Sequence, residues 1–169
     1  MLKSIISELD SKGFQQLKHL HVQNNSEMKC IIYSKGLVIA DVVFPVLETF
    51  SLKNMINLNE ICRGQIPLTS FGNLSIVKVE HCGKLKFIFS SSIAKSLSQL
   101  QTLEIRECSI MGAIVEKEEG RIEDGDMKLF PQLRRLLLYC LPKLMSFSST
   151  QNSDITDAGE VIPESEQVH

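Results

Sequence analysis

The sequence has no tryptophan and only two tyrosines among its 169 residues, so it lacks the aromatic side chains on which nucleic-acid bases usually stack. Its most apolar run, Gly36 to Leu47, is too short to span a bilayer and includes Asp41. The first residues lack the long apolar stretch of a secretory signal. We therefore expect a cytoplasmic chain with no membrane span and no nucleic-acid partner.

The motifs of common catalytic and cofactor sites are also missing. Neither of the glycine-rich phosphate-binding patterns, G-x-x-x-x-G-K-[ST] and G-x-G-x-x-G, occurs. No Ser, His and acid set, and no Cys and His set, stands at a motif spacing. His19 and His21 lie two residues apart but have no third ligand at matching spacing, which favours surface residues over a metal site. We expect no enzyme activity, no cofactor and no metal.

The five cysteines form no C-x-x-C pair, and their number is odd. This pattern fits neither a zinc site nor a secreted disulfide framework. They occur at regular intervals instead, which favours buried structural thiols and leaves a redox role as the alternative. The cysteines are Cys30, Cys62, Cys82, Cys108 and Cys140.

What the sequence does contain is a repeated apolar pattern. Its anchor leucines recur at steps of 30, 27, 26 and 33 residues. Apolar residues also occupy the positions three before each anchor and three, five, eleven and fourteen after it, in all five repeats. Such periodicity is the signature of a solenoid, in which each unit buries its apolar side against its neighbours. The anchors are Leu17, Leu47, Leu74, Leu100 and Leu133.

The fourth repeat shows the local structure that this pattern predicts. Leu103-Glu104-Ile105 alternates with a period of two, as in a short strand with one inward face. The steps of three on either side are typical of tight turns. The resulting spacing, L-x-x-L-x-L-x-x-C, predicts an α/β solenoid of the leucine-rich-repeat type. We expect a horseshoe with short parallel strands on its concave face and an irregular or short helical convex side.

We divide the chain into three parts. Residues 1–12 are a degraded repeat or an N-terminal flank, residues 13–150 are an array of about five repeats, and residues 151–169 are a disordered acidic tail. An acidic loop over Glu116 to Asp126 explains the long last step. The loop and the tail together have a net charge of −9. Since the whole chain has a net charge of −2, the repeat body has a net charge of about +7. This charge could attract an acidic surface or the chain's own tail, or could only promote solubility.

The side chains between the inward positions of the strands are expected to line the concave face and to form a protein-binding surface. Lys53 and Glu80 would be lateral neighbours of opposite charge, as would Lys78 and Glu104. Exposed Ile76, Leu137 and Tyr139 favour a contact surface over a charge ladder that only keeps the sheet soluble. The predicted surface consists of His19, His21, Lys53, Ile76, Lys78, Glu80, Glu104, Arg106, Arg135, Leu137 and Tyr139.

Three segments carry a family resemblance. They are the run from Phe44-Pro45-Val46-Leu47 to Phe50-Ser51-Leu52, the equivalent run from Phe130-Pro131-Gln132-Leu133 to Leu141-Pro142-Lys143-Leu144, and Cys82-Gly83-Lys84-Leu85. The first two resemble the F-P-x-L-x-x-L-x-L…L-P-x-L repeats of plant nucleotide-binding leucine-rich-repeat disease-resistance proteins of the coiled-coil class. The third, which continues with Lys86-Phe87-Ile88-Phe89, resembles the C-x-x-L-x-x-[IL]-F segment of that family. The resemblance covers about residues 13–150.

The resemblance implies a protein-recognition module of an intracellular immune receptor. In that family the repeat region senses pathogen effectors, directly or through a guarded host protein, and restrains a nucleotide-binding module. That module is not in this sequence, so ATP binding is not transferred to it. The alternative is a leucine-rich-repeat adaptor of the F-box type, which recruits substrates for ubiquitin transfer.

Overall fold

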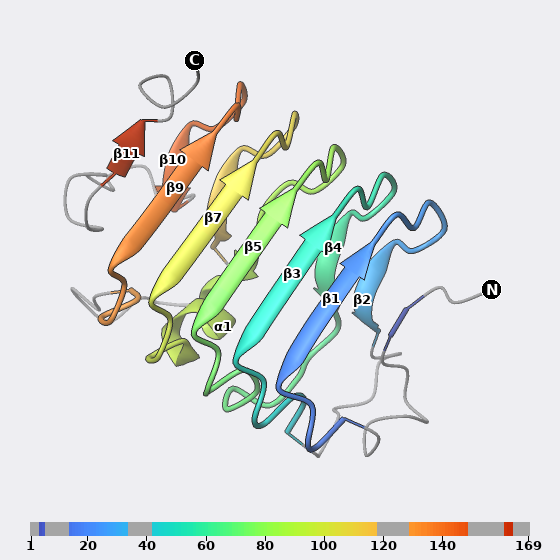
Figure 1. Cartoon of the computed structure of the whole chain (residues 1–169), viewed down its shortest axis with the longest axis vertical. Coiled ribbons are helices and arrows are strands. Elements are labelled where there is room, and N and C mark those ends of the chain that lie inside the picture. Colours follow the sequence, from blue (N-terminus) through green and yellow to red (C-terminus); the bar gives the residue numbers. More distant parts are fainter. Residues whose placement is uncertain (1–3, 6–13, 34–41, 118–128, 149–160, 164–169) are drawn as a thin grey trace.

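The structure, a computed structural model, describes residues 4–5, 14–33, 42–117, 129–148 and 161–163. Its largest element is one parallel six-stranded sheet, here called the front sheet, in the order β1-β3-β5-β7-β9-β11 (Figure 1). Each of the five predicted repeats contributes one strand to this sheet, and the predicted parallel-strand solenoid is confirmed. The strands are β1 (His19–Gln23), β3 (Thr49–Lys53), β5 (Ile76–Glu80), β7 (Thr102–Arg106), β9 (Arg135–Tyr139) and β11 (Val161–Pro163).

The register of the front sheet follows the sequence columns without a shift. Leu20 pairs with Phe50, Phe50 with Val77, Val77 with Leu103 and Leu103 with Leu136. A one-residue slip would turn every inward side chain to the other face, so burial of the apolar columns specifies this register. The inward positions of the repeats therefore form continuous rows across the sheet.

A left-handed residue ends each front strand of the five repeats. These residues have φ between 48° and 56°, and four of them donate their backbone N–H to the last residue of the next strand at 2.9–3.0 Å. The backbone therefore turns away from the sheet while the hydrogen-bond ladder continues into the turn. The left-handed residues are Asn24, Asn54, His81, Glu107 and Cys140.

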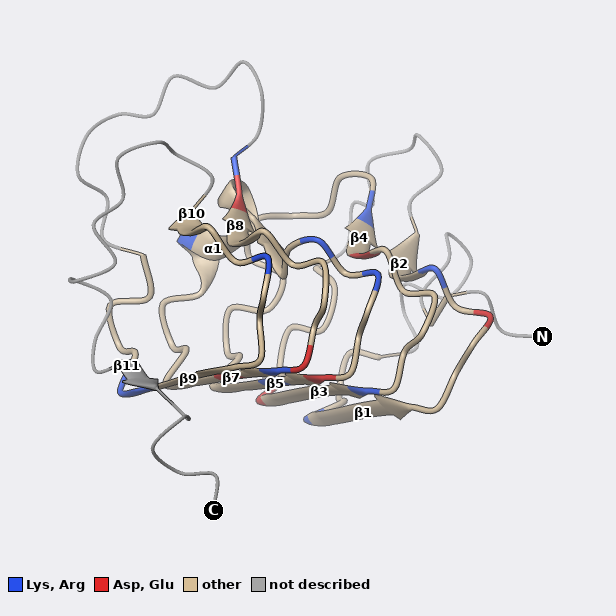
Figure 2. Cartoon of the chain, turned by 90° about the horizontal axis from the view of Figure 1, so that it is seen from above, with Lys and Arg blue, Asp and Glu red and all other residues tan. Residues whose placement is uncertain are grey.

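The back of the solenoid is built differently from the front. Its strands form two separate sheets, β2-β4 and β10-β8-β6, and one short helix, α1, follows β6. Figure 2 shows these elements on one side of the front sheet, with the two back sheets apart from each other. The predicted short helical side is thus represented by α1, and short strands make up the rest. The elements are β2 (Cys30–Tyr33), β4 (Glu60–Arg63), β6 (Phe89–Ser90), α1 (Ser91–Ser96), β8 (Ala113–Glu116) and β10 (Ser146–Ser148).

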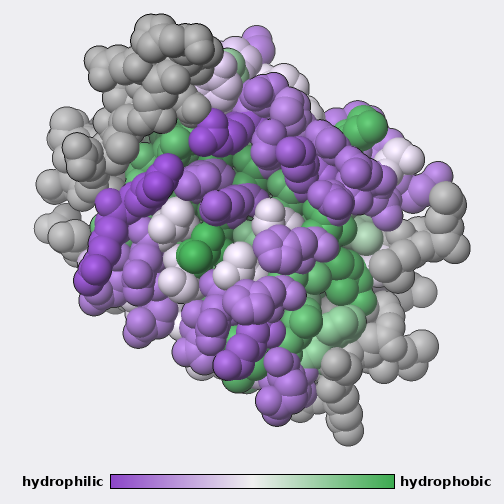
Figure 3. Space-filling model, in the orientation of Figure 1, coloured by the Kyte–Doolittle hydropathy of each residue, from purple (hydrophilic) through white to green (hydrophobic). Residues whose placement is uncertain are grey.

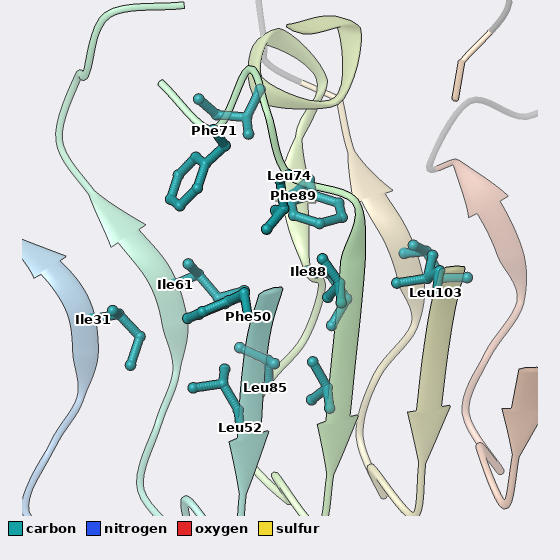
Figure 4. Close-up of a cluster of buried hydrophobic side chains, with 14 of the residues drawn as sticks. Ile31, Phe50, Leu52, Ile61, Phe71, Leu74, Leu85, Ile88, Phe89 and Leu103 are labelled. Atoms are coloured by element: carbon teal, nitrogen blue, oxygen red, sulfur yellow. The ribbon is translucent and has the colours of Figure 1, made fainter. Parts of the chain in front are cut away.

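The core lies between the front sheet and the back strands. In the three middle repeats the anchor and the two inward strand residues are at most 1% exposed, as for Leu74, Val77 and Val79. The corresponding residues of the first repeat, Leu17, Leu20 and Val22, are only partly buried. Figure 4 shows front residues such as Phe50 and Leu103 in one cluster with back residues such as Ile61 and Ile88. The middle repeats therefore supply most of the apolar burial.

A row of phenylalanines connects the turns that precede the front strands. The ring centroids of Phe14 and Phe44 are 5.8 Å apart, and those of Phe44 and Phe71 are 5.7 Å apart. The fourth repeat has Leu97 at this position, and there Phe89 of β6 contacts Phe130 at 6.0 Å. Three of these phenylalanines (Phe44, Phe71 and Phe130) have φ of 53–63°, a left-handed conformation that is unusual for a bulky residue. Burial of their rings at 1–3% exposure offsets that backbone strain.

Parts of the predicted domain division lie outside the described residues. Of residues 1–12, the structure describes Ser4 and Ile5, and the Ile5 N–H donates to the Ile31 carbonyl at 2.8 Å. Most of the acidic loop, residues 118–126, is outside. Of the tail, only β11 is described, and it pairs with β9. Disorder of the tail and the curvature of a horseshoe remain predictions.

Candidate functional site

The candidate site is the front face, which we define as the surface of the front sheet that points away from the core. Positions one, three and five of each strand point to this face, because side chains alternate along a strand. Parallel pairing in register places equivalent positions side by side in three columns. Excluding β11, the columns are His19, Thr49, Ile76, Thr102 and Arg135; His21, Ser51, Lys78, Glu104 and Leu137; and Gln23, Lys53, Glu80, Arg106 and Tyr139.

Charged side chains pair across neighbouring strands of the front face. Lys53 Nζ lies 3.6 Å from Glu80 Oε2, and Lys78 Nζ lies 3.9 Å from Glu104 Oε2. Both lateral pairs were predicted from the sequence and are confirmed. Arg135 Nε approaches the other oxygen of Glu104 at 3.3 Å, so this carboxylate is shared between two cations on either side of it.

The side chains of these pairs differ in exposure. The side chains of Lys53, Lys78 and Arg135 are 50–56% exposed, whereas that of Glu104 is 13% exposed. Exposed ion pairs contribute about 0–1 kcal/mol each to stability. This range applies to the Lys53–Glu80 pair, whereas the largely buried Glu104 carboxylate depends more on its two cations.

The charged columns continue into the turn at one end of the front face. His81 Nδ1 lies 3.4 Å from Glu80 Oε1, and His81 Nε2 contacts Glu107 Oε2. Both His81 and Glu107 occupy the left-handed position that follows a strand. We did not predict this cluster. The position directly after each strand recurs in every repeat, so His81 and Glu107 could have been expected to be lateral neighbours.

The apolar part of the front face is smaller than the sequence suggests. Ile76 and Tyr139 are partly exposed, as expected, but Leu137 is 1% exposed, and its prediction as an exposed contact residue is wrong. The physical reason is the sixth strand: β11 pairs with β9, with Ile162 opposite Leu137, so β9 is not the edge of the sheet. In Figure 3, polar residues dominate the surface over the strands, and apolar patches lie among them.

A shallow hollow lies where the front strands begin. It has a volume of about 600 Å³ and is lined by residues of four repeats, including His19, Thr49, Ile76 and Gln101. Its walls are mostly polar, and it crosses the turns rather than entering the core. Such a surface suits contact with another macromolecule better than enclosure of a small molecule.

Three of the five thiols are buried, as a structural role requires, Cys62 is partly buried, and one is an exception. Cys82 and Cys108 are fully buried in consecutive turns, and their Sγ atoms donate to the backbone carbonyls of Glu80 and Arg106 at 3.5 and 3.4 Å. Asn25 occupies the equivalent position in the first repeat, where its Oδ1 accepts from two backbone N–H groups at 2.8 Å. The exception is Cys140, which is exposed.

The pKa values of Cys82 and Cys62 are raised, whereas the hydrogen bond with Cys82 lowers that of Cys108. A hydrogen bond with Cys108 and burial together raise the pKa of Cys82. On the back, burial raises the pKa of Cys62 to about 12, and the nearby Glu60 carboxylate adds to this shift. These two thiols are therefore protonated at neutral pH, which makes them poor nucleophiles and poor metal ligands.

Two further properties concern only the described part of the chain. Within it, no group of three or more His, Cys, Asp or Glu side chains lies together as a metal site would require, so His19 and His21 are not joined by a third ligand. None of its helices is long and apolar enough to cross a membrane.

Comparison with known proteins identifies a family. A family model described as plant disease resistance protein RPS2-like, leucine-rich repeats, matches residues 1–109. This range includes β1 to β7, with the middle repeats and most of the charged columns. No curated protein and no solved structure matches the chain.

Proposed function

Since the chain belongs to the leucine-rich-repeat region of RPS2-like plant disease resistance proteins, we propose that its front face is a docking surface for another protein. In this role the chain recognises a pathogen effector or a guarded host protein inside the plant cell. It also restrains the nucleotide-binding module of a receptor of the coiled-coil class. The match to disease resistance proteins gives no support to an F-box adaptor.

The observation that carries this proposal is the registered arrangement of the front strands. Five strands present three columns of outward side chains. In two of these columns cations and carboxylates are lateral neighbours, as in the Lys53–Glu80 and Lys78–Glu104 pairs, and Ile76 and Tyr139 are partly exposed on the same face. Charge patterns of this kind favour specificity and rapid association between proteins. Partly exposed aromatic and aliphatic side chains supply the apolar contacts that usually dominate binding energy.

The shape of the front face also supports recognition rather than catalysis. Within the described residues, the front face offers no deep pocket to enclose a substrate, and the buried thiols are directed into turns. A broad, mostly polar surface is what a reversible protein contact needs. Recognition is therefore the function that this geometry supports best.

A charge-reversal experiment tests the proposal. The face variant combines Lys53→Glu, Lys78→Glu and Arg135→Glu, and the matched control combines Lys29→Glu, Lys84→Glu and Lys143→Glu. The control residues are exposed, lie in the turns that follow the strands, and undergo the same change of net charge. Circular dichroism melting establishes that both variants fold.

The binding assay uses the purified nucleotide-binding module of a coiled-coil-class plant resistance receptor. We expect the face variant to lose about tenfold or more in affinity, whereas the control stays within about twofold of the unmodified chain. Equal affinity of the two variants would place the contact elsewhere on the solenoid. Absence of binding by the unmodified chain would remove the restraining role from the proposal.

A further inference from the structure

The back of the solenoid is open at one place where the front is closed. The front strands β3 and β5 pair directly along their full length, from Thr49–Ile76 to Lys53–Glu80. Their back counterparts in the same two repeats, β4 and β6, do not pair. In the part of the chain that the structure describes, β4 pairs only with β2 and β6 pairs only with β8. Each of the two back sheets therefore ends in a strand edge at this place.

Local structure keeps the two edges from pairing. Ser90 ends β6 after two residues, because it is the N-cap of α1 and its Oγ accepts from the Ile93 N–H at 3.4 Å. After β4, Gly64 turns the chain with φ 101° into a loop that is fixed at its far end. There the fully buried Ser70 accepts from the Val43 N–H at 2.9 Å. The opening is thus a built feature of the second and third repeats.

The opening forms a cleft with a volume of about 640 Å³. Its apolar walls come from the loop after β4, from β6 and from α1, with Ile66, Phe71, Phe89 and Ile93 among the lining residues. At the rim Leu68 is 54% exposed. This size and apolar lining are typical of sites that enclose part of a ligand.

The β4 edge presents backbone groups to the cleft. The Glu60 N–H points toward β2, where it donates to the Lys29 carbonyl at 3.4 Å. Backbone groups alternate sides along a strand, so those of Ile61, which also lines the cleft, point away from β2. A free strand edge of this kind is a template for pairing with another extended chain.

The charge of the cleft has one sign. Among its described lining residues the charged ones are Glu60 and Glu116, and none is Lys, Arg or His. Burial raises the pKa of Glu116, the negative charge of Glu60 raises it further, and the nearby positive charge of Lys86, which does not line the cleft, opposes this shift in part. Arg63 pairs with Glu60 at 2.5 Å, but its side chain points to solvent with 46% exposure. An additional cation in the cleft would therefore be attracted to both carboxylates.

We propose that this cleft is a second binding surface, which takes an extended basic peptide segment of a partner protein. The segment adds as a strand to the free edge of β4, so that backbone hydrogen bonds provide affinity. Alternate apolar side chains contact Ile66 and Phe89, and the intervening Lys or Arg side chains pair with Glu60 and Glu116. This surface lies on the back, so it is independent of the docking role of the front face.

Peptides with defined chemistry test the proposal on the full 169-residue chain. The probe is a fluorescent peptide that alternates valine and lysine, and its affinity is measured by fluorescence anisotropy. One comparison peptide has glutamate in place of lysine, and another has the valine–lysine sequence with N-methylated backbone amides at alternate residues. We expect each comparison peptide to bind about tenfold more weakly or not at all.

Matched variants locate the binding. Leu68→Arg places a cation at the rim of the cleft and should reduce affinity about tenfold, whereas Ile56→Arg changes an equally exposed residue outside it and should have no effect. Glu60→Gln with Glu116→Gln should weaken binding about threefold or more, and Glu27→Gln with Glu48→Gln should not. All four replace exposed or partly exposed side chains, so folding is expected to survive.

Several results would overturn the proposal. Equal affinity for the glutamate peptide would exclude charge selection, and equal affinity for the N-methylated peptide would exclude strand addition. Equal loss in Leu68→Arg and Ile56→Arg would place the peptide outside the cleft. No measurable binding of the valine–lysine peptide would also contradict it, whatever the outcome for the front face.

Discussion

The two sides of this solenoid differ in how completely their strands pair. On the front, strands of all five repeats form one ladder with β11, and the ladder continues into the left-handed turns. On the back, the strands are shorter and form two sheets with a cleft between β4 and β6. The same repeats therefore give a regular surface on one side and an interrupted one on the other.

This difference follows from the lengths of the connections. From each anchor leucine to the end of its front strand the spacing is the same in every repeat, whereas the segments after the back strands vary. The second repeat has the loop from Gly64 to Ser70, and the third has α1. In the described part of the second and third repeats the variation thus lies on the back, and loops of this kind often carry function. The following predictions test that contrast, from the largest expected effect to the smallest.

A charge in the front core should have the largest effect. Ile105 is fully buried in β7, so Ile105→Asp leaves an unpaired carboxylate among apolar side chains. We expect a loss of about 4 kcal/mol or more in the free energy of unfolding, or no folded protein at all. The adjacent Glu104→Gln changes the front face and should cost less than about 1.5 kcal/mol. Urea denaturation followed by circular dichroism measures both, and similar losses would contradict the assigned facing.

Truncation should distinguish the closed core from the open cleft. Phe50 is 1% exposed and its ring centroid lies 6.4 Å from that of Phe71, so Phe50→Ala leaves a cavity and should cost about 3–5 kcal/mol. Ile66 is 9% exposed but lines the cleft, where solvent can fill the space, so Ile66→Ala loses apolar burial without leaving an enclosed cavity and should cost about 2 kcal/mol. Thermal melting of both variants gives the comparison. Equal costs would mean that the back is as tightly packed as the front.

Thiol labelling tests burial without mutation. Cys140 is exposed, Cys62 is partly buried with a pKa raised to about 12, and the other three cysteines are buried. Iodoacetamide at pH 8 should therefore modify Cys140 rapidly and the other four slowly in the folded protein, and all five in denaturant. Peptide mass spectrometry identifies the modified sites. Rapid modification of Cys82 or Cys108 would show that the turns are not packed as described.

The smallest effect concerns the acidic rim of the cleft. Since the pKa of Glu116 is raised above its usual 4.5, the folded state disfavours the carboxylate at neutral pH. Glu116→Gln should therefore stabilise the protein at pH 7, by no more than about 0.5 kcal/mol because the site is exposed. This gain should disappear as the pH falls through the raised pKa toward 4.5, where the folded state binds the proton. A gain that instead grows at low pH would contradict the direction of the shift.

The front of the molecule could be predicted from the sequence because its signals are local and repeated. Apolar positions such as Val77 and Val79 alternate with polar ones, and the fixed distance to each anchor determines the register. The lateral neighbours follow directly from that register. This is why the Lys53–Glu80 and Lys78–Glu104 pairs were predicted correctly.

The features that were missed have different origins. Burial of Leu137 follows from β11, a strand outside the repeat pattern and separated from β9 by 21 residues. The cleft depends on where β6 ends, and the N-cap at Ser90 decides this. The His81 cluster arises because successive turns place His81 beside Glu107. Pairing with a distant strand thus determines the first feature, a local helix cap the second, and contact between successive turns the third.

Residue-resolved hydrogen exchange tests the contrast between the two sides most directly. Amides of β3, β5 and β7 that bond to a neighbouring front strand should exchange only through global unfolding, with similar protection in all three strands. Amides of β4 that point toward the cleft, such as that of Ile61, should exchange orders of magnitude faster than those of β3. Uniformly high protection on both sides would mean that β4 and β6 are paired and the cleft is closed. Low protection across the front strands would contradict the continuous registered sheet.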